Sequence, residues 1–285
     1  MNVDSLLQHF HRIADAPDAV ARLRRFVLDL AVRGKLVAQD PEDEPAAVLL
    51  ERIGRERKRL VREGKIKKEK LLPQISVVDR KFELPGGWEW IRLGDLSNFV
   101  TSGSRDWAKY YSNEGAIFIR MGNLSKEHYH LRLEHIQHVN PPSNGEGTRT
   151  RLVAGDILIS ITGDVGMLGL IPEGFGEAYI NQHTAMVPPM PEMKGRYLAE
   201  LFRSPFSQDQ FNEPQRGIKN SFRLTDVTQF IVPLPPLAEQ QRIVAKVDEL
   251  MAVCDALESN LASAADTRRR LLDSLLFHAL APKAG

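Results

Sequence analysis

Apolar positions at helical spacing mark the first third of the chain. One stripe recurs every three or four residues: Val20, Leu23, Val27, Leu30 and Ala31. This spacing predicts an amphipathic helix that ends near Gly34, where a left-handed C-terminal cap is expected. A second helix is predicted after a turn, because Asp43, Glu44 and Pro45 suit a first helical turn. Its apolar stripe consists of Val48, Leu49, Ile53 and Leu60.

The pattern changes over residues 88–236 to short strand-like runs separated by polar loops. Three runs carry this signal: WEWIRLGDL, AIFIRMGNL and GDILISITG. The isoleucines at 157, 159 and 161 alternate as in a β-strand, and the glycines around them predict turns. One helix is predicted around residues 196–211. A proline and two glycines at 85–87 predict a domain boundary near Leu84.

A long helix is predicted after the proline-rich sequence PLPPLAEQQRIV, because no proline or glycine follows until Pro282. Its apolar seam has a heptad-like spacing that only Arg268 interrupts: Ile243, Val247, Leu250, Cys254, Leu257, Leu261, Ala264, Leu271 and Leu275. About 40 residues at about 1.5 Å each make a rod of about 60 Å. The seam favours a coiled coil. A helix packed on its own domain is the alternative, but it would need a wider apolar face.

These patterns together predict an α+β protein. A helical N-terminal region covers residues 1–83, a mixed α/β domain covers 84–236, and a coiled-coil helix covers 237–285. The 285 residues with 42% apolar composition suffice for a buried core. No apolar run approaches the ~20 residues that cross a bilayer, and the N-terminus lacks the pattern of a secretory signal. The single cysteine, Cys254, fits a reducing cytoplasm, which is the location we expect.

The formal charge of +1 hides a local concentration of basic residues. The segment from Arg52 to Lys70 contains ten bases and three acids. Such a run is most often a solvated helix face, but it is also suited to lie along phosphates.

No residue pattern predicts a catalytic or metal site. The sequence NPPS at 140–143 lacks the aromatic fourth residue with which amino-methyltransferases stack on a flipped base, so we interpret it as a loop. Neither a dinucleotide-binding glycine turn nor a GxxxxGK[ST] phosphate loop occurs. Four histidines cluster without zinc-ligand spacing: His128, His130, His135 and His138.

The loops instead carry side chains suited to contacting DNA. Arginine can pair with guanine, asparagine and glutamine can read adenine, and hydroxyl or basic groups can bind phosphate. A hydrogen bond within its own loop is equally plausible for each candidate. The candidates are Ser102, Ser104, Arg105, Lys109, Tyr110, Tyr111, Arg120, Asn123, Asn181, Gln182, Arg216, Lys219, Asn220 and Arg223.

Four segments give the chain a family resemblance. PLPPLAEQQRIVAKVDELMAVCDALE at 233–258 resembles the region of type I restriction-modification specificity (S) subunits where a target-recognition domain ends and a spacer helix begins. LPGGWEWIRLGDL at 84–96 resembles the start of such a domain, and GDILISITGDVG at 155–166 its central strand. LRRFVLDLAVRGKLVAQDPEDEPAAVLLERI at 23–53 resembles the helical N-terminal region of many members.

The resemblance implies a non-catalytic protein that selects double-stranded DNA for other subunits. Methyltransferase (M) subunits would modify adenine with S-adenosylmethionine, and a restriction (R) subunit would use ATP, so no cofactor is expected on this chain. The usual S subunit has two recognition domains, whereas this chain has one and looks half-length.

An exposed heptad seam would leave leucines in water at ~1.5–3 kcal/mol each. We therefore expect a homodimer with antiparallel spacer helices, or else pairing with a different half-subunit. The predicted contact residues are Ile243, Val247, Leu250, Cys254, Leu257, Leu261, Leu271 and Leu275.

Two other functions stay open at this point. One is a half-subunit that competes for M subunits without selecting DNA. The other is a complete methyltransferase or nuclease whose motifs are not evident, which would transfer methyl groups without an added M subunit.

Overall fold

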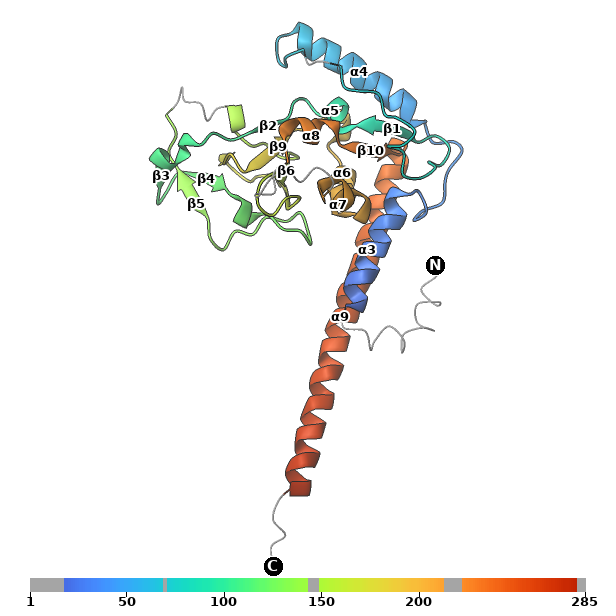
Figure 1. The fold of residues 1–285 in the computed structure, drawn as a ribbon, viewed down its shortest axis with the longest axis vertical. Helices are drawn as coiled ribbons and strands as arrows, with labels where there is room; N and C mark the ends of the chain where they lie inside the picture. Colours follow the sequence, from blue (N-terminus) through green and yellow to red (C-terminus); the bar gives the residue numbers. More distant parts are fainter. Residues whose placement is uncertain (1–17, 69–70, 143–148, 213–221, 281–285) are drawn as a thin grey trace, which may run out of the picture. The chain divides into compact units, whose positions relative to one another are not determined.

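The N-terminal part of the chain is helical, as its apolar stripes predict (Figure 1). The computed structural model describes residues 18–68, 71–142, 149–212 and 222–280. Helix α3 spans Ala19–Val32 and is followed by Gly34, whose φ is 64°. A Cβ at Gly34 would lie 2.3 Å from Cγ of Pro85, so both the left-handed conformation and the close approach require glycine.

Helix α4 spans Ala46–Arg62 and packs through three buried residues, Ala46, Leu49 and Ile53. Pro45 is its N-cap, one position earlier than the first helical turn in which we predicted it. The carboxylate of Asp43 does not interact with the N-terminus of α4, because it pairs with Arg242.

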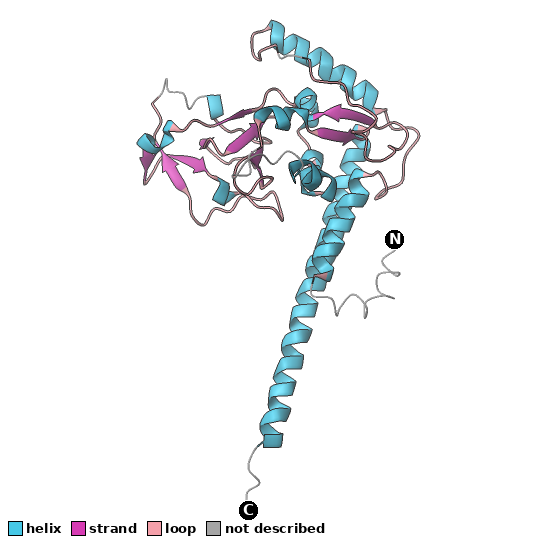
Figure 2. Cartoon of the chain, in the orientation of Figure 1, coloured by secondary structure: helices cyan, strands magenta, loops and turns pink. Residues whose placement is uncertain are grey.

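The described residues form two compact units, one of residues 18–27 with 245–280 and one of the described residues between 28 and 244. The larger unit holds three β-sheets and most of the short helices (Figure 2). The predicted division at Leu84 and Leu237 stays a prediction.

The two ends of the middle segment meet in a two-stranded antiparallel sheet. Strand β1 (Glu89–Arg92) pairs with β10 (Ile231–Leu234), so that residues 139 positions apart, Arg92 and Ile231, lie opposite each other after a long loop of chain. Helices α5 (Leu93–Leu96) and α8 (Leu224–Gln229) lie next to this sheet in the sequence and contact each other. The pairing thus joins the start and the end of the middle segment.

Two four-stranded sheets make up the rest of the larger unit. The first is antiparallel and has the order β2 (Thr101–Ser102), β9 (Thr184–Val187), β6 (Ile157–Ser160) and β7 (Leu168–Leu170). The second has the order β3 (Tyr111–Ser112), β5 (Gln137–Val139), β4 (Ala116–Ile119) and β8 (Ala178–Ile180). Within it, β4 and β8 are parallel. Short 3-10 helices η1 (Asp106–Tyr110), η2 (Met121–Asn123) and η4 (Pro191–Met193) follow β2, β4 and β9.

The main core contains side chains from both of these sheets. Ile119 and Ile180 from one sheet are buried in the same cluster as Leu158 and Met186 from the other. Strand β6 is buried on both faces, although its isoleucines alternate in the way that predicts a half-exposed strand. Other parts of the chain therefore cover both faces of this antiparallel sheet at β6.

The helix predicted around residues 196–211 is two helices, α6 (Tyr197–Arg203) and α7 (Pro205–Asn212). Pro205 has no N–H to donate, and its ring excludes the α conformation from the residue before it. Ser204 accordingly has a ψ of 155°. The break therefore follows from one proline.

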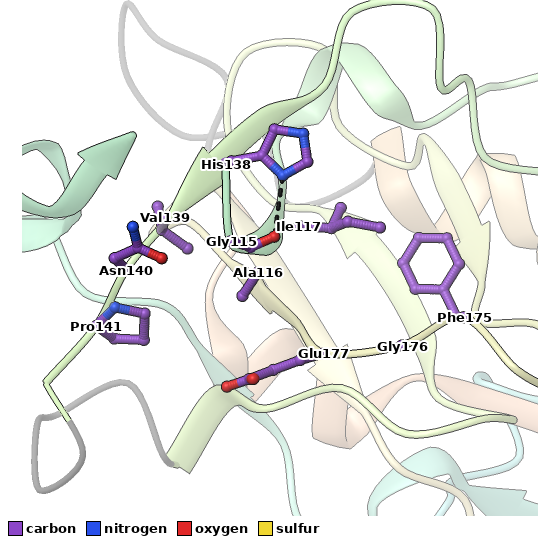
Figure 3. A pocket seen from close by; sticks show the side chains of 10 residues that line it. All are labelled: Gly115, Ala116, Ile117, His138, Val139, Asn140, Pro141, Phe175, Gly176 and Glu177. Carbon is purple, nitrogen blue, oxygen red and sulfur yellow. Dashed lines mark hydrogen bonds between the residues drawn. The ribbon is translucent and has the colours of Figure 1, made fainter. Parts of the chain in front are cut away.

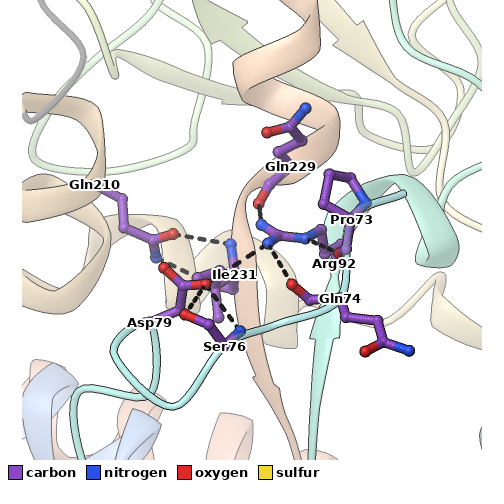
Figure 4. Close-up of polar contacts among 8 residues, drawn as sticks. All are labelled: Pro73, Gln74, Ser76, Asp79, Arg92, Gln210, Gln229 and Ile231. Atoms are coloured by element: carbon purple, nitrogen blue, oxygen red, sulfur yellow. Dashed lines mark hydrogen bonds and ion pairs between the residues drawn. The ribbon is translucent and has the colours of Figure 1, made fainter. Parts of the chain in front are cut away.

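Arg92 holds the segment before the sheets in place (Figure 4). Its Nε donates to the carbonyl of Pro73 at 2.7 Å and its Nη1 to that of Gln229 at 2.5 Å. Asp79 closes a turn of the same segment by accepting from the backbone and hydroxyl of Ser76. The guanidinium therefore ties this connection to the end of α8.

Helix α9 spans Leu237–Leu280, as the absence of helix breakers predicts. Its first turn is fixed inside the larger unit by Glu239, whose carboxylate accepts from Nε1 of Trp88 at 2.9 Å and from Nε2 of Gln39 at 2.6 Å. Burial raises the pKa of Glu239. Arg242 adds an ion pair with Asp43 at 2.5 Å.

The smaller unit contains the start of α3 and most of α9, and Arg24 joins them. Its guanidinium contacts Asp255 at 2.6 Å and Glu258 at 2.7 Å. Val247 and Cys254 on the seam are buried, whereas Leu271 and Leu275 are 60% and 67% exposed. The seam is thus covered by the chain itself near its start and open to solvent near its end.

None of the helices in the described ranges is both long enough and apolar enough to span a membrane.

Candidate functional site

Loops from four strands meet at one edge of the two large sheets. The centre is the turn of residues 181–183, which joins β8 of one sheet to β9 of the other. The backbone N–H of Asn181 donates to Ile119 at the end of β4, and its carbonyl accepts from Gly103 after β2. The carbonyl of His183 accepts from Ile161 after β6 at 2.9 Å. Segments far apart in the sequence therefore form one surface.

Gly103 is required for this meeting. A Cβ at this position would lie 2.0 Å from the carbonyl oxygen of Ile180 and 2.6 Å from the carbonyl carbon of Asn181. Both contacts are with backbone, which cannot move aside as a flexible side chain can. The loop after β2 can therefore reach the turn only because residue 103 has no side chain.

A side-chain network covers the turn. Oδ1 of Asn181 accepts from the backbone N–H of His183 and from the hydroxyl of Thr184, both at 3.1 Å. Nε2 of Gln182 lies 2.9 Å from Nε2 of His183, and Nδ1 of His183 lies 2.6 Å from the hydroxyl of Thr162. Asn181 shapes the turn, and Gln182 and His183 lie over it.

The loop after β6 forms the second part of the surface. The hydroxyl of Ser160 donates to the carbonyl of Asp164 at 2.5 Å and accepts from the backbone of Met167 at 2.8 Å. The carboxylate of Asp164 pairs with Lys126. Ile161 accepts from the backbone of Phe222, which brings Arg223 to the same region.

The loop of residues 101–111 carries the largest group of predicted contact residues. Trp107 anchors it, with its ring 5.1 Å from that of Phe118 and 5.0 Å from that of Tyr179. Around this buried ring, Arg105 and Lys109 are exposed. Figure 1 shows the loop between β2 and β3.

Other side chains of this loop are partly used within it. The Lys109 ammonium lies 5.1 Å above the ring of Tyr110 and 3.7 Å from Asp106. The hydroxyl of Ser104 accepts from the backbone of Asp106, and Ser102 pairs with β9. Tyr111 is exposed on β3, with its ring 5.6 Å from that of Phe118. Arg105, in contrast, is exposed, and its side chain makes no hydrogen bond or ion pair with the described residues of this loop.

The prediction for Asn123 is wrong in this structure. Its side chain is 4% exposed, and Oδ1 accepts from the backbone of Arg120 at 2.9 Å. Its Nδ2 donates to the carbonyl of Arg132 at 2.8 Å. An amide that is buried and bonded in this way stabilises the loop after β4 and is not available to a base. Arg120, beside it, stays a candidate.

Some predicted positions lie outside the described residues. These are Arg216, Lys219, Asn220 and the last residue of the NPPS sequence, Ser143. The described part of that sequence, residues 140–142, is a loop as predicted, and Nδ2 of Asn140 donates to the hydroxyl of Ser112.

Sequence reasoning missed three residues of the surface: Thr162, Asp164 and Lys126. The first two follow a predicted strand in the run Thr-Gly-Asp-Val-Gly, so a polar turn at the end of β6 was the available signal. No sequence signal marks Lys126, because its pairing with Asp164 depends on the tertiary fold.

A separate hollow of about 580 Å³ lies at the other end of the parallel pair β4–β8 (Figure 3). It is lined by residues that precede these strands, including Gly115 and Glu177, and by the end of β5. His138 is fixed at its wall, because Nδ1 lies 3.1 Å from the carbonyl of Gly115. The hollow is therefore distinct from the loop surface.

Within residues 18–68, 71–142, 149–212 and 222–280, no group of three or more histidine, cysteine or acidic side chains has the geometry to hold a metal ion. His128 instead lies 3.0 Å through Nδ1 from the carbonyl of His130.

The chain that carries this loop surface is a member of a known protein family. Residues 85–265 match the family described as type I restriction modification DNA specificity domain, and the chain belongs to this family. It is 33% identical over 288 residues to the type I restriction enzyme EcoAI specificity subunit of Escherichia coli, covering 96% of this chain and 48% of that protein. The EcoEI specificity subunit of the same organism is 30% identical over 283 residues, with 96% and 47% covered. The chain thus spans about half the length of these relatives.

Solved structures support the fold. The HsdS subunit from Thermoanaerobacter tengcongensis aligns with a TM-score of 0.51 at 20% identity, over 92% of this chain and 58% of that one. A chain from a study of complex assembly and conformational transition of the type I R-M system aligns with a TM-score of 0.55 at 20% identity, over 97% and 59%.

Proposed function

We propose that the chain is a DNA sequence-specificity subunit that reads one half of a two-part target. The observation that carries this proposal is the convergence of the four loops around residues 181–183. Gly103 and the Asn181 backbone hold those loops together, so that Arg105, Gln182 and Arg223 belong to one surface. Arginine and glutamine are the side chains that pair with guanine and adenine in the major groove.

In this proposal, other subunits carry out the catalytic steps. M subunits hold the DNA and flip the target adenine, because a base inside a duplex is out of reach of an active site. S-adenosylmethionine binds the M subunits, and ATP is used by the R subunit. This chain is non-catalytic, needs no cofactor of its own and works in the cytoplasm, where its DNA lies.

The second half of the target requires a second recognition surface. The exposed end of the α9 seam supports an assembly through this helix, because Leu271 and Leu275 face solvent. We propose a homodimer with antiparallel helices, which requires the two half-sites to be inverted copies. Ile243, Val247 and Cys254 are already buried inside the chain, so the proposed contact rests on the later part of the seam.

Methylation sequencing of cells that express the chain with its M subunits tests the function. The expected result is one methylated adenine motif, symmetric if the chain forms a homodimer. Arg105→Ala and Gln182→Ala should each relax the motif at a base position, and Arg80→Ala, away from the loops, serves as the control. Methylation without a motif would instead indicate a half-subunit that occupies M subunits without selecting DNA.

A further inference from the structure

Helix α4 presents a basic face to solvent that the proposed reading of bases does not use. Arg55, Lys58 and Arg62 are exposed and follow one another at intervals of three and four residues. At about 1.5 Å per residue and 3.6 residues per turn, they form one stripe about 10 Å long. The exposed Lys67 and Lys68 continue it beyond the helix end.

Some bases of α4 are held in ion pairs and others are not. Arg59 is held by Glu56 at 2.5 Å and by Glu63 at 2.7 Å, and Lys65 also pairs with Glu63. Arg52 pairs with Glu44. Within the part of the chain that the structure describes, no ion pair is recorded for Arg55, Lys58 or Arg62. Among the described residues, no carboxylate forms an ion pair with the stripe, although Glu51 lies one turn before Arg55 on the same face.

The opposite face fixes the helix firmly to the larger unit. Ala46, Leu49 and Ile53 are buried, and one turn further Arg57 donates to the carbonyls of Gly94 at 2.7 Å and Ser97 at 2.5 Å. A helix anchored at this many points holds its exposed charges in a defined place. This distinguishes the stripe from a charged tail that moves freely.

The anchor lies near the proposed DNA surface. Ser97 is four residues from Thr101, where β2 leads into the loop that carries Arg105. Four extended residues span at most about 14 Å, so the carbonyl that Arg57 holds is within that distance of β2. Duplex DNA carries one phosphate per 3.4 Å of axis on each strand. The stripe lies on the opposite face of α4, about 10 Å further away. One turn of a duplex is about 34 Å long, so it can reach from the loops to the stripe.

We propose that the Arg55–Lys58–Arg62 face of α4 binds the sugar-phosphate backbone of DNA beside the half-site that the loops read. This inference rests on the proposed function, since it needs a DNA complex, but it assigns a different task to a different element. Contacts with phosphate add affinity and fix register without reading sequence. The face therefore acts equally on target and non-target DNA.

The test uses the full chain assembled with the M subunits of its system. A triple variant, Arg55→Gln, Lys58→Gln and Arg62→Gln, is compared with the unchanged complex on a duplex carrying the mapped target and on a scrambled duplex. Affinity for DNA falls as salt rises, and each lost phosphate contact makes the slope of log affinity against log salt shallower by about 0.9. The slope should fall by about three, and binding should weaken about 10- to 100-fold on both duplexes, with their ratio unchanged.

Two control variants make the result specific. Glu51→Lys places a new base one turn before Arg55 on the exposed face and should steepen the slope. Lys246→Gln, Arg269→Gln and Arg270→Gln remove the same charge from α9 away from its seam and should leave the slope unchanged. An equal effect from the α9 variant would overturn the inference, because the effect would then come from net charge.

Three further outcomes would contradict either the inference about α4 or the proposed function. A triple variant with an unchanged slope overturns the inference while leaving the proposed function intact, provided that the unchanged complex prefers its target. Loss of M subunits from the triple variant on gel filtration would overturn it in favour of a protein contact. If the unchanged complex shows no preference between the two duplexes, the proposed function itself fails.

Discussion

Asp156 is a buried carboxyl group at the start of β6. It is 2% exposed and accepts from the backbone of Val153 at 2.9 Å. Burial raises its pKa to about 6, against an ordinary value of 3.8, and the Val153 hydrogen bond and Lys194 only partly oppose this. Between these two pKa values the folded chain keeps a proton that the unfolded chain releases, so the free energy of unfolding falls as pH rises.

Replacing Asp156 by asparagine should remove this pH dependence. Two pKa units correspond to about 3 kcal/mol, so Asp156→Asn should be more stable than the unchanged chain at pH 7 by up to that amount. The two should converge near pH 4, where the native carboxyl group is neutral. Urea unfolding at both pH values measures this, with the exposed Asp106→Asn as control. Equal pH dependence in the two chains would show that Asp156 does not titrate as stated.

Asn123 and Arg105 make a matched pair that separates structural from DNA-reading residues. Asn123→Ala removes hydrogen bonds to buried backbone groups and should lower the free energy of unfolding by about 1–3 kcal/mol. Arg105→Ala is a surface change and should stay within about 0.5 kcal/mol. Thermal unfolding of both variants checks this. If the two variants are equally stable, the amide of Asn123 is not structural.

The buried carboxylate of Glu239 helps to fix the start of α9. Trp88→Phe removes the hydrogen bond from Nε1 to Glu239 and should destabilise the chain by about 1–3 kcal/mol, because the carboxylate is 1% exposed and no water replaces the donor.

Trp90→Phe is the matched control for that change. The ring of Trp90 packs against Phe82 and Phe206, at 4.9 and 5.9 Å, and its removal loses only packing area. Denaturant unfolding of both variants should show the larger loss for Trp88→Phe. Equal losses would mean that the hydrogen bond to Glu239 contributes nothing.

The sequence predicts the long elements well because their signal is local. The apolar stripes of α3 and α4 and the lack of breakers in α9 are each visible within a few turns. The strands are harder, since β2 and β3 have two residues each and their pairing depends on distant partners such as Ala185 and Val139. The sequence therefore indicates strands without their sheet order.

In the candidate site, too, the sequence predicts what depends on local residue types and misses what depends on the tertiary fold. Residue types suited to DNA are visible in the sequence, but an asparagine that reads a base and one that caps a loop look alike. Only the tertiary structure separates Asn123, which is buried, from Gln182, which lies over the central turn. The convergence itself depends on Gly103 meeting Asn181, a contact between residues far apart in the sequence.

At the scale of the whole molecule, the late part of α9 decides the assembly. Leu271 and Leu275 continue a seam whose earlier members, Val247 and Cys254, are buried within the chain. Covering two such leucines with a second copy gains about 1.5–3 kcal/mol for each side chain. Light scattering at micromolar concentration should therefore give twice the chain mass of 32.1 kDa.

Replacing both leucines by glutamine should shift that mass to the monomer. The pair Ser259→Gln and Asp273→Gln alters the same helix away from the seam and should leave the dimer intact. The variant monomer should keep the helix content of the unchanged chain, because α3 and Arg24 still hold the covered part of α9. If the unchanged chain is already a monomer, the second recognition surface must come from a different half-subunit. Mixing the chain with that partner would then restore the larger mass only while both leucines are present.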